Sequence, residues 1–305
     1  TGLKMLENTK NKGLRALIDA CGLEGKMIST YHIGFVLAPC FNAAGRLKEI
    51  KMARELLMEQ DMEQAVFRAE ELKRLNDERK QMTEEGVKQA VAMVEKRENA
   101  TGHNQYVGEQ ILSVYLENLH ESIAGIVAGR LKEYFCRPAF VFAPAEEGIK
   151  GSGRSVECYH MFDGLVKCED LLERFGGHPM AAGLSMKTEN YELFKRRINE
   201  QSGLTEADLI EKVKIDAAMP FSYITTNLIE EFSHLEPFGK GNEKPLFAQK
   251  NVKFLEARIL GKNKNVLKFL LENEEGIRLE AVYFGEVDAF TEYVELNNNT
   301  TRTEE

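Results

Sequence analysis

The segment Phe175-Gly176-Gly177-His178-Pro179-Met180-Ala181-Ala182-Gly183 leads from a glycine-rich loop into a predicted strand over 181–186. Two adjacent glycines allow close approach of the backbone and positive φ angles. A histidine at such a place can donate to a phosphate oxygen or transfer a proton. Because a histidine in a loop is more often structural, this segment alone leaves both roles open.

Helices and strands alternate on both sides of this segment. The pattern predicts a helix over 123–135 and a buried strand over 138–143 on its N-terminal side. It predicts helices over 164–174 and 190–201 around the 181–186 strand. Alternation of this kind indicates an α/β domain.

The flanking regions have a different character. Residues 46–85 contain neither Gly nor Pro and carry apolar residues at helical spacing, which predicts one long helix or two helices broken near Asp61. A helix that is polar on most faces usually connects domains. Short apolar segments near 212–218, 246–260, 266–272 and 277–284 predict a small barrel or sandwich, followed by a polar tail over 297–305.

Composition limits the class of protein. The 305 residues allow two or three domains, and no apolar run is long enough to predict a membrane span. The five cysteines include no CxxC pair and indicate free thiols in a reducing cytoplasm. The same spacing argues against a zinc site. The net charge of −9 argues against a general nucleic-acid binder but leaves room for a local basic groove.

Two segments present polar groups suited to a phosphate. The segment 39–47, which begins with a predicted loop over 39–45, carries Asn42 and Arg46 at the start of a helix. An arginine fork binds a phosphate through two hydrogen bonds. The turn 148–154, with Ser155 after it, offers glycine backbone amides together with Ser152, Ser155 and Arg154. The alternatives are a surface salt bridge for Arg46 and an ordinary β-turn for the glycine-rich segment.

Two further segments carry weaker signals. His120 precedes a helix whose small residues, at 124, 125, 128 and 129, favour close packing, and from there His120 can reach a ligand. Beyond 205, lysines alternate with aromatic residues, as in a surface that binds single-stranded nucleic acid; the lysines are Lys240, Lys250, Lys253, Lys262, Lys264 and Lys268, with Phe254 and Phe269. Residues 206–305 nevertheless hold 12 Lys and Arg against 19 Asp and Glu, so a barrel core with solvated charges is the alternative.

The order of the motifs is more specific than any one of them. The chain runs from Asn42-Ala43-Ala44-Gly45-Arg46 through a long helix to His120 and Gly125-Ile126-Val127-Ala128-Gly129-Arg130. It continues through Gly151-Ser152-Gly153-Arg154-Ser155 and Gly176-Gly177-His178 to Leu235-Glu236-Pro237-Phe238-Gly239. In this order the motifs resemble the RecJ family of single-strand-specific DNA exonucleases, within the DHH phosphoesterase superfamily.

The resemblance implies a domain organisation. Residues 1–46 resemble the C-terminal remnant of the DHH catalytic domain, and 47–100 resemble the connecting helix. Residues 101–204 resemble the substrate-gripping DHHA1 domain, an α/β domain, and 205–296 an OB-fold β-barrel that binds nucleic acid. The implied activity is 5′-to-3′ hydrolysis of single-stranded DNA to mononucleotides in DNA repair and recombination.

The resemblance also implies site residues. Phosphate binding maps onto Asn42, Arg46, His120, Ser152, Arg154, Ser155, Gly176, Gly177 and His178, with Arg154 and His178 in catalytic roles. Family members use Mn²⁺ or Mg²⁺, held by carboxylates and an Asp-His-His triplet that lie N-terminal to Thr1; no metal ligand is expected in this chain. Ala38-Pro39-Cys40 stands where many relatives have Gly-Pro-Arg, so one arginine contact is missing. Because such enzymes activate water with their metals, we expect this chain to bind DNA without hydrolysing it.

Two other functions stay open at this point. The chain fits a catalytically inactive protein that binds single strands or partners, or a phosphoesterase that acts on short oligonucleotides. The expected partners are single-stranded DNA and a helicase or a single-strand-binding protein. The resemblance further implies a cytoplasmic monomer without membrane contact.

Overall fold

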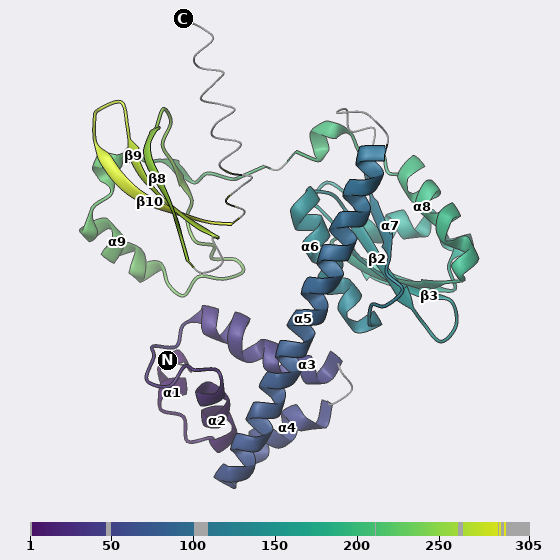
Figure 1. The fold of residues 1–305 in the computed structure, drawn as a ribbon, viewed down its shortest axis with the longest axis horizontal. Coiled ribbons are helices and arrows are strands. Elements are labelled where there is room, and N and C mark those ends of the chain that lie inside the picture. The colour runs from purple at the N-terminus through teal and green to yellow at the C-terminus, as the bar shows by residue number, and fades with distance from the viewer. Residues whose placement is uncertain are drawn as a thin grey trace, which may run out of the picture. The chain divides into compact units, whose positions relative to one another are not determined.

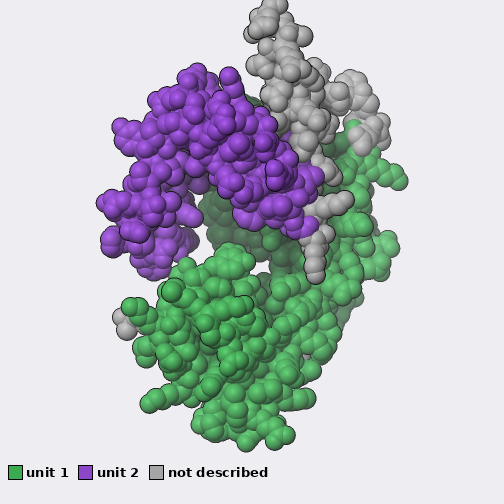
Figure 2. All heavy atoms as spheres, turned by 60° about the vertical axis from the view of Figure 1, so that its left-hand side comes forward, with its two compact units in different colours: residues 1–212 green, residues 213–305 purple. Residues whose placement is uncertain are grey.

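The computed structural model describes residues 2–46, 50–100, 109–210, 212–261, 265–285, 287 and 290. The chain forms two compact units, residues 1–212 and residues 213–305, which are coloured separately in Figure 2. No helix in the described residues is both long and apolar enough to cross a membrane.

The first unit begins with short helices packed on the first half of a long one. They are α1 (Gly2–Glu7), α2 (Lys12–Ala20), a π-helical segment (His32–Leu37), α3 (Ala38–Arg46) and α4 (Ile50–Met58). The predicted loop over 39–45 is wrong, because these residues form α3. Pro39 is tolerated there since it lies in the first helical turn, where its missing N–H costs no intrahelical bond.

Helix α5 (Met62–Ala100) spans 39 residues, and with α4 it confirms the predicted pair of helices with a break near Asp61. The assignment of 47–100 as the connecting helix of the family stays a prediction. The Asp61 carboxylate accepts the Gln64 N–H at 2.9 Å and so caps the helix start. Buried residues of its first half, such as Leu72, join the N-terminal core, and Ala90 and Val94 join the core of the α/β domain. The helix therefore belongs to two cores. Figure 1 shows it running from the N-terminal helices to the α/β domain.

The α/β domain is built on a five-stranded sheet in the order β1-β2-β3-β5-β4. Only β1 and β2 are parallel. The strands are β1 (Leu112–Tyr115), β2 (Ala139–Pro144), β3 (Ile149–Arg154), β4 (Arg174–His178) and β5 (Ala181–Met186). Helix α6 (Glu121–Phe135) and α5 cover one face, while α7 (Met161–Val166) and α8 (Tyr191–Glu200) cover the other (Figure 1).

Two glycine-rich segments are strands rather than the predicted turn and loop. The segment 148–154 forms β3 after Gly148, and Gly176 to His178 belong to β4. A Cβ on Gly153 would lie 2.3 Å from the Met161 sulfur, so this glycine allows the sheet to pack on its core. The helix predicted over 164–174 ends at Val166 and gives way to a 3₁₀ turn (Glu169–Leu171) and then β4. The other predicted helices and strands of this domain are confirmed.

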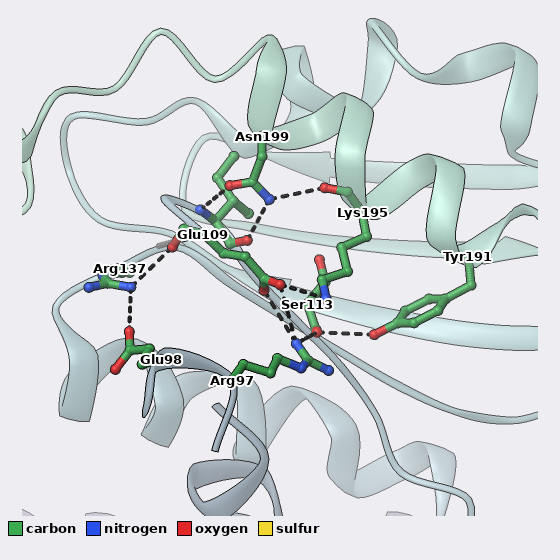
Figure 3. Close-up of polar contacts among 9 residues, drawn as sticks. Arg97, Glu98, Glu109, Ser113, Arg137, Tyr191, Lys195 and Asn199 are labelled. Carbon is green, nitrogen blue, oxygen red and sulfur yellow. Dashed lines mark hydrogen bonds and ion pairs between the residues drawn. The ribbon is translucent and has the colours of Figure 1, made fainter. Parts of the chain in front are cut away.

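A polar network fixes the end of α5 to the α/β domain (Figure 3). Arg97 of α5 donates to the Ser113 carbonyl at 2.9 Å and forms an ion pair with Glu109. Glu109 also forms an ion pair with Lys195 of α8, at 2.5 Å. Buried Arg137 joins Glu98 of α5 at 2.9 Å. Because every charge in the network has a partner, we assign the network to stability rather than to a ligand.

The second unit is a small β domain. Strands β8 (Lys253–Leu260), β9 (Val266–Glu272) and β10 (Arg278–Phe284) form an antiparallel sheet in the order β10-β9-β8. Strands β6 (Ala217–Ala218) and β7 (Phe247–Ala248) form a parallel pair, and α9 covers Thr226–Phe232. The predicted strand segments are confirmed, whereas closure into an OB barrel stays a prediction.

Candidate anion-binding site

The registers of β3, β5 and β4 bring the predicted site residues onto one face of the sheet. Paired residues of antiparallel strands point to the same side, as do residues two apart in one strand. Two adjacent rows result, Ser152–Gly183–Gly176 and Arg154–Ala181–His178. This face lies opposite the phenylalanine core. His178 and Arg154 are two strand spacings apart, or about 10 Å.

The strip between these side chains is open. A Cβ on Gly176 would meet no atom within 4 Å, and one on Gly183 would meet only the Gly151 carbonyl oxygen at 4.0 Å. A ligand can therefore approach the sheet backbone closely at both glycines. Gly177 points to the other side, where a Cβ would lie 2.5 Å from the Ala181 carbonyl oxygen. Its role in the fold is thus close backbone packing.

The N-terminus of α6 borders this strip. His120 caps the helix, because its Nδ1 accepts the Ser122 N–H at 3.3 Å. Arg46 of α3 reaches the same turn and donates from Nη1 to the Ser122 carbonyl at 2.5 Å. Asn42 lies one turn earlier on α3 and is exposed. The helix dipole adds positive potential where Arg46 and His120 meet.

Arg154 lies flat against α6. A Cβ on Gly125 would be 2.8 Å from its Nη2, so the glycine makes room for the guanidinium. Burial, followed by the nearby charge of Arg46, lowers the pKa of Arg154. The two arginines are therefore close enough to repel each other.

A third arginine, Arg79 of α5, was not among the predicted site residues and lies near Arg46. Arg79 donates to the Asn76 side-chain oxygen at 3.2 and 3.0 Å. Burial and Arg46 lower the pKa of Arg79 as well. The sequence signal was available: Asn76, Arg79 and Thr83 continue the apolar stripe of α5 with polar residues, and two of these three are buried.

No described carboxylate forms an ion pair with Arg46, Arg79 or Arg154. Other basic residues nearby do have acidic partners; Lys150, for example, pairs with Glu121 at 2.7 Å. Clustered cations that repel one another bind an anion favourably, because the anion relieves their repulsion and gains charge-assisted hydrogen bonds. The arrangement is suited to a phosphate.

The remaining predicted residues lie elsewhere or are engaged. Ser155 is buried and donates to the Tyr159 carbonyl at 2.6 Å, so its hydroxyl serves the fold. His178 is exposed, and its Nδ1 accepts the Met180 N–H at 3.3 Å. That bond orients the ring.

In the second unit, Lys240, Lys250 and Lys253 are exposed, while Lys264 lies outside the described residues. Lys268 pairs with Glu280 at 2.8 Å. The prediction of Phe269 as a stacking surface is wrong, because its ring is buried in the core of this unit.

The donors gathered here do not fit a divalent cation. Mg²⁺ and Mn²⁺ prefer oxygen ligands, while this site offers guanidinium groups and a histidine. Within the described ranges, no three His, Cys, Asp or Glu side chains come together as a metal site.

Comparison with known proteins matches two regions of the chain to family models. Residues 108–203 match the family model of the DHHA1 domain, and residues 215–301 match that of the RecJ OB domain. The single-stranded-DNA-specific exonuclease RecJ of Bacillus subtilis is 36% identical over 287 residues, which cover 93% of this chain and 35% of that protein. The chain belongs to the RecJ family.

Further RecJ proteins show the same extent of similarity. RecJ of Escherichia coli is 33% identical over 268 residues, covering 85% of this chain and 45% of that protein. The crystal structure of RecJ from Thermus thermophilus in complex with Mg²⁺ superposes with a TM-score of 0.76 at 30% identity, covering 94% of this chain and 42% of that one. The chain thus spans less than half the length of these RecJ relatives.

Proposed function

We propose that this chain is the substrate-binding portion of a RecJ-type single-strand-specific exonuclease. The observation that carries the proposal is the group Arg46, Arg79 and Arg154, which has no described carboxylate partner beside the α6 N-terminus. The three guanidinium groups bind a backbone phosphate. Asn42, Ser152 and His178 add polar contacts around it, and Gly176 leaves room for the sugar and phosphate.

The domain assignments follow from the same proposal. Residues 1–46 with the connecting helix 47–100 correspond to the end of the DHH domain and its linker, and 101–204 to the DHHA1 domain. Residues 205–296 form the OB-fold region, which makes a second contact with the strand. Support comes from the two family models and from the extent of similarity to RecJ proteins.

The chemical role is to hold and polarise the phosphate. Arginine donors stabilise negative charge on the phosphate oxygens. His178, with its Nδ1 engaged by the backbone, presents its other ring nitrogen for a hydrogen bond or a proton. Neither group supplies the attacking water, so we propose binding without hydrolysis by these residues alone.

The test is binding of a fluorescent single strand of about 20 nucleotides, followed by anisotropy. Arg154→Ala should weaken binding about 10- to 100-fold, because it removes a charge-assisted contact of about 1.5–3 kcal/mol. Arg130→Ala is the matched control, since Arg130 lies on α6 and pairs with Glu133 on the exposed surface. Equal losses in the two variants would contradict the site.

The length of the substrate separates this proposal from action on short oligonucleotides. The strand should bind more tightly than a dinucleotide and more tightly than a duplex of the same sequence. Equal affinity for the strand and the dinucleotide would favour the phosphoesterase alternative.

A further inference from the structure

Two cysteines far apart in the sequence lie side by side in the N-terminal helical part of the first unit. Cys21 directly follows α2 as its C-cap residue, and Cys40 lies near the start of α3. Their sulfur atoms are 3.9 Å apart and form a thiol–thiol hydrogen bond. In the described residues this is the one contact between two cysteine side chains that the structure records.

The two thiols differ in access. Cys40 is buried, with 1% of its surface exposed, and its sulfur also lies 3.3 Å from the Val36 carbonyl oxygen. Cys21 is partly exposed. A small solute can thus reach the Cys21 sulfur, whereas the Cys40 sulfur is shielded from solvent.

The electrostatic surroundings also distinguish the pair. The hydrogen bond from Cys40, with Lys73 and Lys80 of α5, lowers the pKa of Cys21 to about 7, against the opposing effects of burial and Asp77. The same hydrogen bond and burial raise the pKa of Cys40. Cys21 is therefore the thiol of the pair that loses its proton first, and its thiolate can accept a hydrogen bond from Cys40.

We propose that Cys21 and Cys40 form a peroxide-sensitive dithiol that closes to an intramolecular disulfide. The Cys21 thiolate attacks a peroxide oxygen, the O–O bond breaks, and the departing oxygen leaves as water after taking a proton, so that Cys21 becomes a sulfenic acid. The Cys40 sulfur, losing its proton, then attacks the Cys21 sulfur and the S–O bond breaks, releasing a second water. Two thiols are oxidised and one hydrogen peroxide is reduced.

The required movement is small. A disulfide places its sulfurs about 2.05 Å apart, so these two approach by about 1.9 Å, and Cys40 gives up its contact with the Val36 carbonyl. Both helices pack on α5 around the same core. The bond joins the end of α2 to α3, the helix that carries Asn42 and Arg46.

The experiment uses the whole chain, reduced and then treated with graded hydrogen peroxide, after which the remaining thiols are alkylated and the peptides mapped by mass. A peptide cross-linked between Cys21 and Cys40 should appear first. Cys158 is the internal comparison. Its residue is exposed, but partial desolvation of the thiol raises its pKa, so it is reachable and poorly ionised. The thiolate fractions near neutral pH predict that Cys21 reacts at least about tenfold faster than Cys158.

Two variants separate the steps. In Cys40→Ser the sulfenic acid of Cys21 has no second thiol, so dimedone should trap it. In Cys21→Ser the cross-link should vanish and Cys40 should stay reduced. The peptide map of the unsubstituted chain tests the cross-link by itself, even if one of the variants fails to fold.

Three results would overturn the proposal: oxidation of Cys158 as fast as Cys21, a cross-link only between different chains, or no trapping by dimedone in Cys40→Ser. The readout is the mass of thiol-containing peptides. It is therefore independent of DNA binding and of the proposed function.

Discussion

The five-stranded sheet of the first unit and the three-stranded sheet of the second unit carry their basic residues in different ways. On the five-stranded sheet, Arg154 lies beside Arg46 and has no described carboxylate partner. On the three-stranded sheet, Lys268 pairs with Glu280, and Arg278 pairs with its cross-strand neighbour Glu272, both at 2.8 Å. A cation that is already neutralised attracts a phosphate weakly. On this ground we propose that phosphate binding concentrates on the first unit.

The two sheets also differ in burial. Helices cover the five-stranded sheet on both faces, except where Gly176 and Gly183 leave it open. Strand β8 of the second unit is exposed along its whole length, with Phe254 and Ile259 among its accessible side chains. We expect the first unit to tolerate little change in volume and the second to contribute apolar or stacking contacts.

The largest expected effect tests this difference in packing. Gly177→Ala should destabilise the first unit by about 3 kcal/mol, because the new Cβ would lie 2.5 Å from a backbone oxygen and 2.6 Å from the Ala182 Cα. Gly239→Ala in the second unit is the matched control, since a Cβ there meets nothing within 4 Å. Denaturant unfolding measures the stability of both variants. Similar midpoints for the two variants would contradict the expected difference in packing between the two units.

The next effect tests the difference in charge. Arg154→Ala should weaken single-strand binding about 10- to 100-fold, whereas Lys268→Ala should change it less than about threefold, because its partner Glu280 already neutralises it. Anisotropy titration at fixed salt gives both dissociation constants. A larger loss from Lys268→Ala would move the main phosphate contact to the second unit.

A smaller effect compares two arginines of one helix. Arg79→Ala should weaken binding about 3- to 10-fold, since Arg79 belongs to the arginine group but is held partly by Asn76. Arg74 pairs with Glu71 and Glu78 on the exposed side of α5, so Arg74→Ala should leave affinity unchanged. If both variants bind like the unsubstituted chain, Arg79 has no part in the site.

The smallest effect concerns salt. Each phosphate contact on a single strand contributes about 0.7 to the slope of log affinity against log salt. Arg46→Ala should reduce the slope by about that amount, and Lys268→Ala should leave it unchanged. Binding titrations at several salt concentrations measure the slope for each variant. An unchanged slope in Arg46→Ala would show that Arg46 contacts no phosphate.

The sequence predicted the elements whose patterns are local. The apolar spacing of α5, the cap at Asp61 and the strand over 181–186 could be read from neighbouring residues, and the structure confirms them. The glycine-rich strands β3 and β4 were misread as a turn and a loop, because glycine is typical of turns. Gly153 is required by the close approach of Met161, which lies on another element and leaves no signal in the neighbouring sequence. Gly177 is required by the close approach of Ala181 across the β4–β5 hairpin, which depends on the strand pairing.

What the sequence by itself determined was the family, through the order of its motifs, and the residue types available for a phosphate. Only the tertiary structure decided which of them meet. Strand register placed Arg154 in the same row as His178. Packing of α3 between α5 and the α/β domain brought Arg46 near both Arg154 and Arg79. The packing of α2 and α3 brought Cys21 to Cys40. The physical reason is that side-chain periodicity fixes the face of an element but not its partner, and the partner depends on how separate elements bury their apolar faces together.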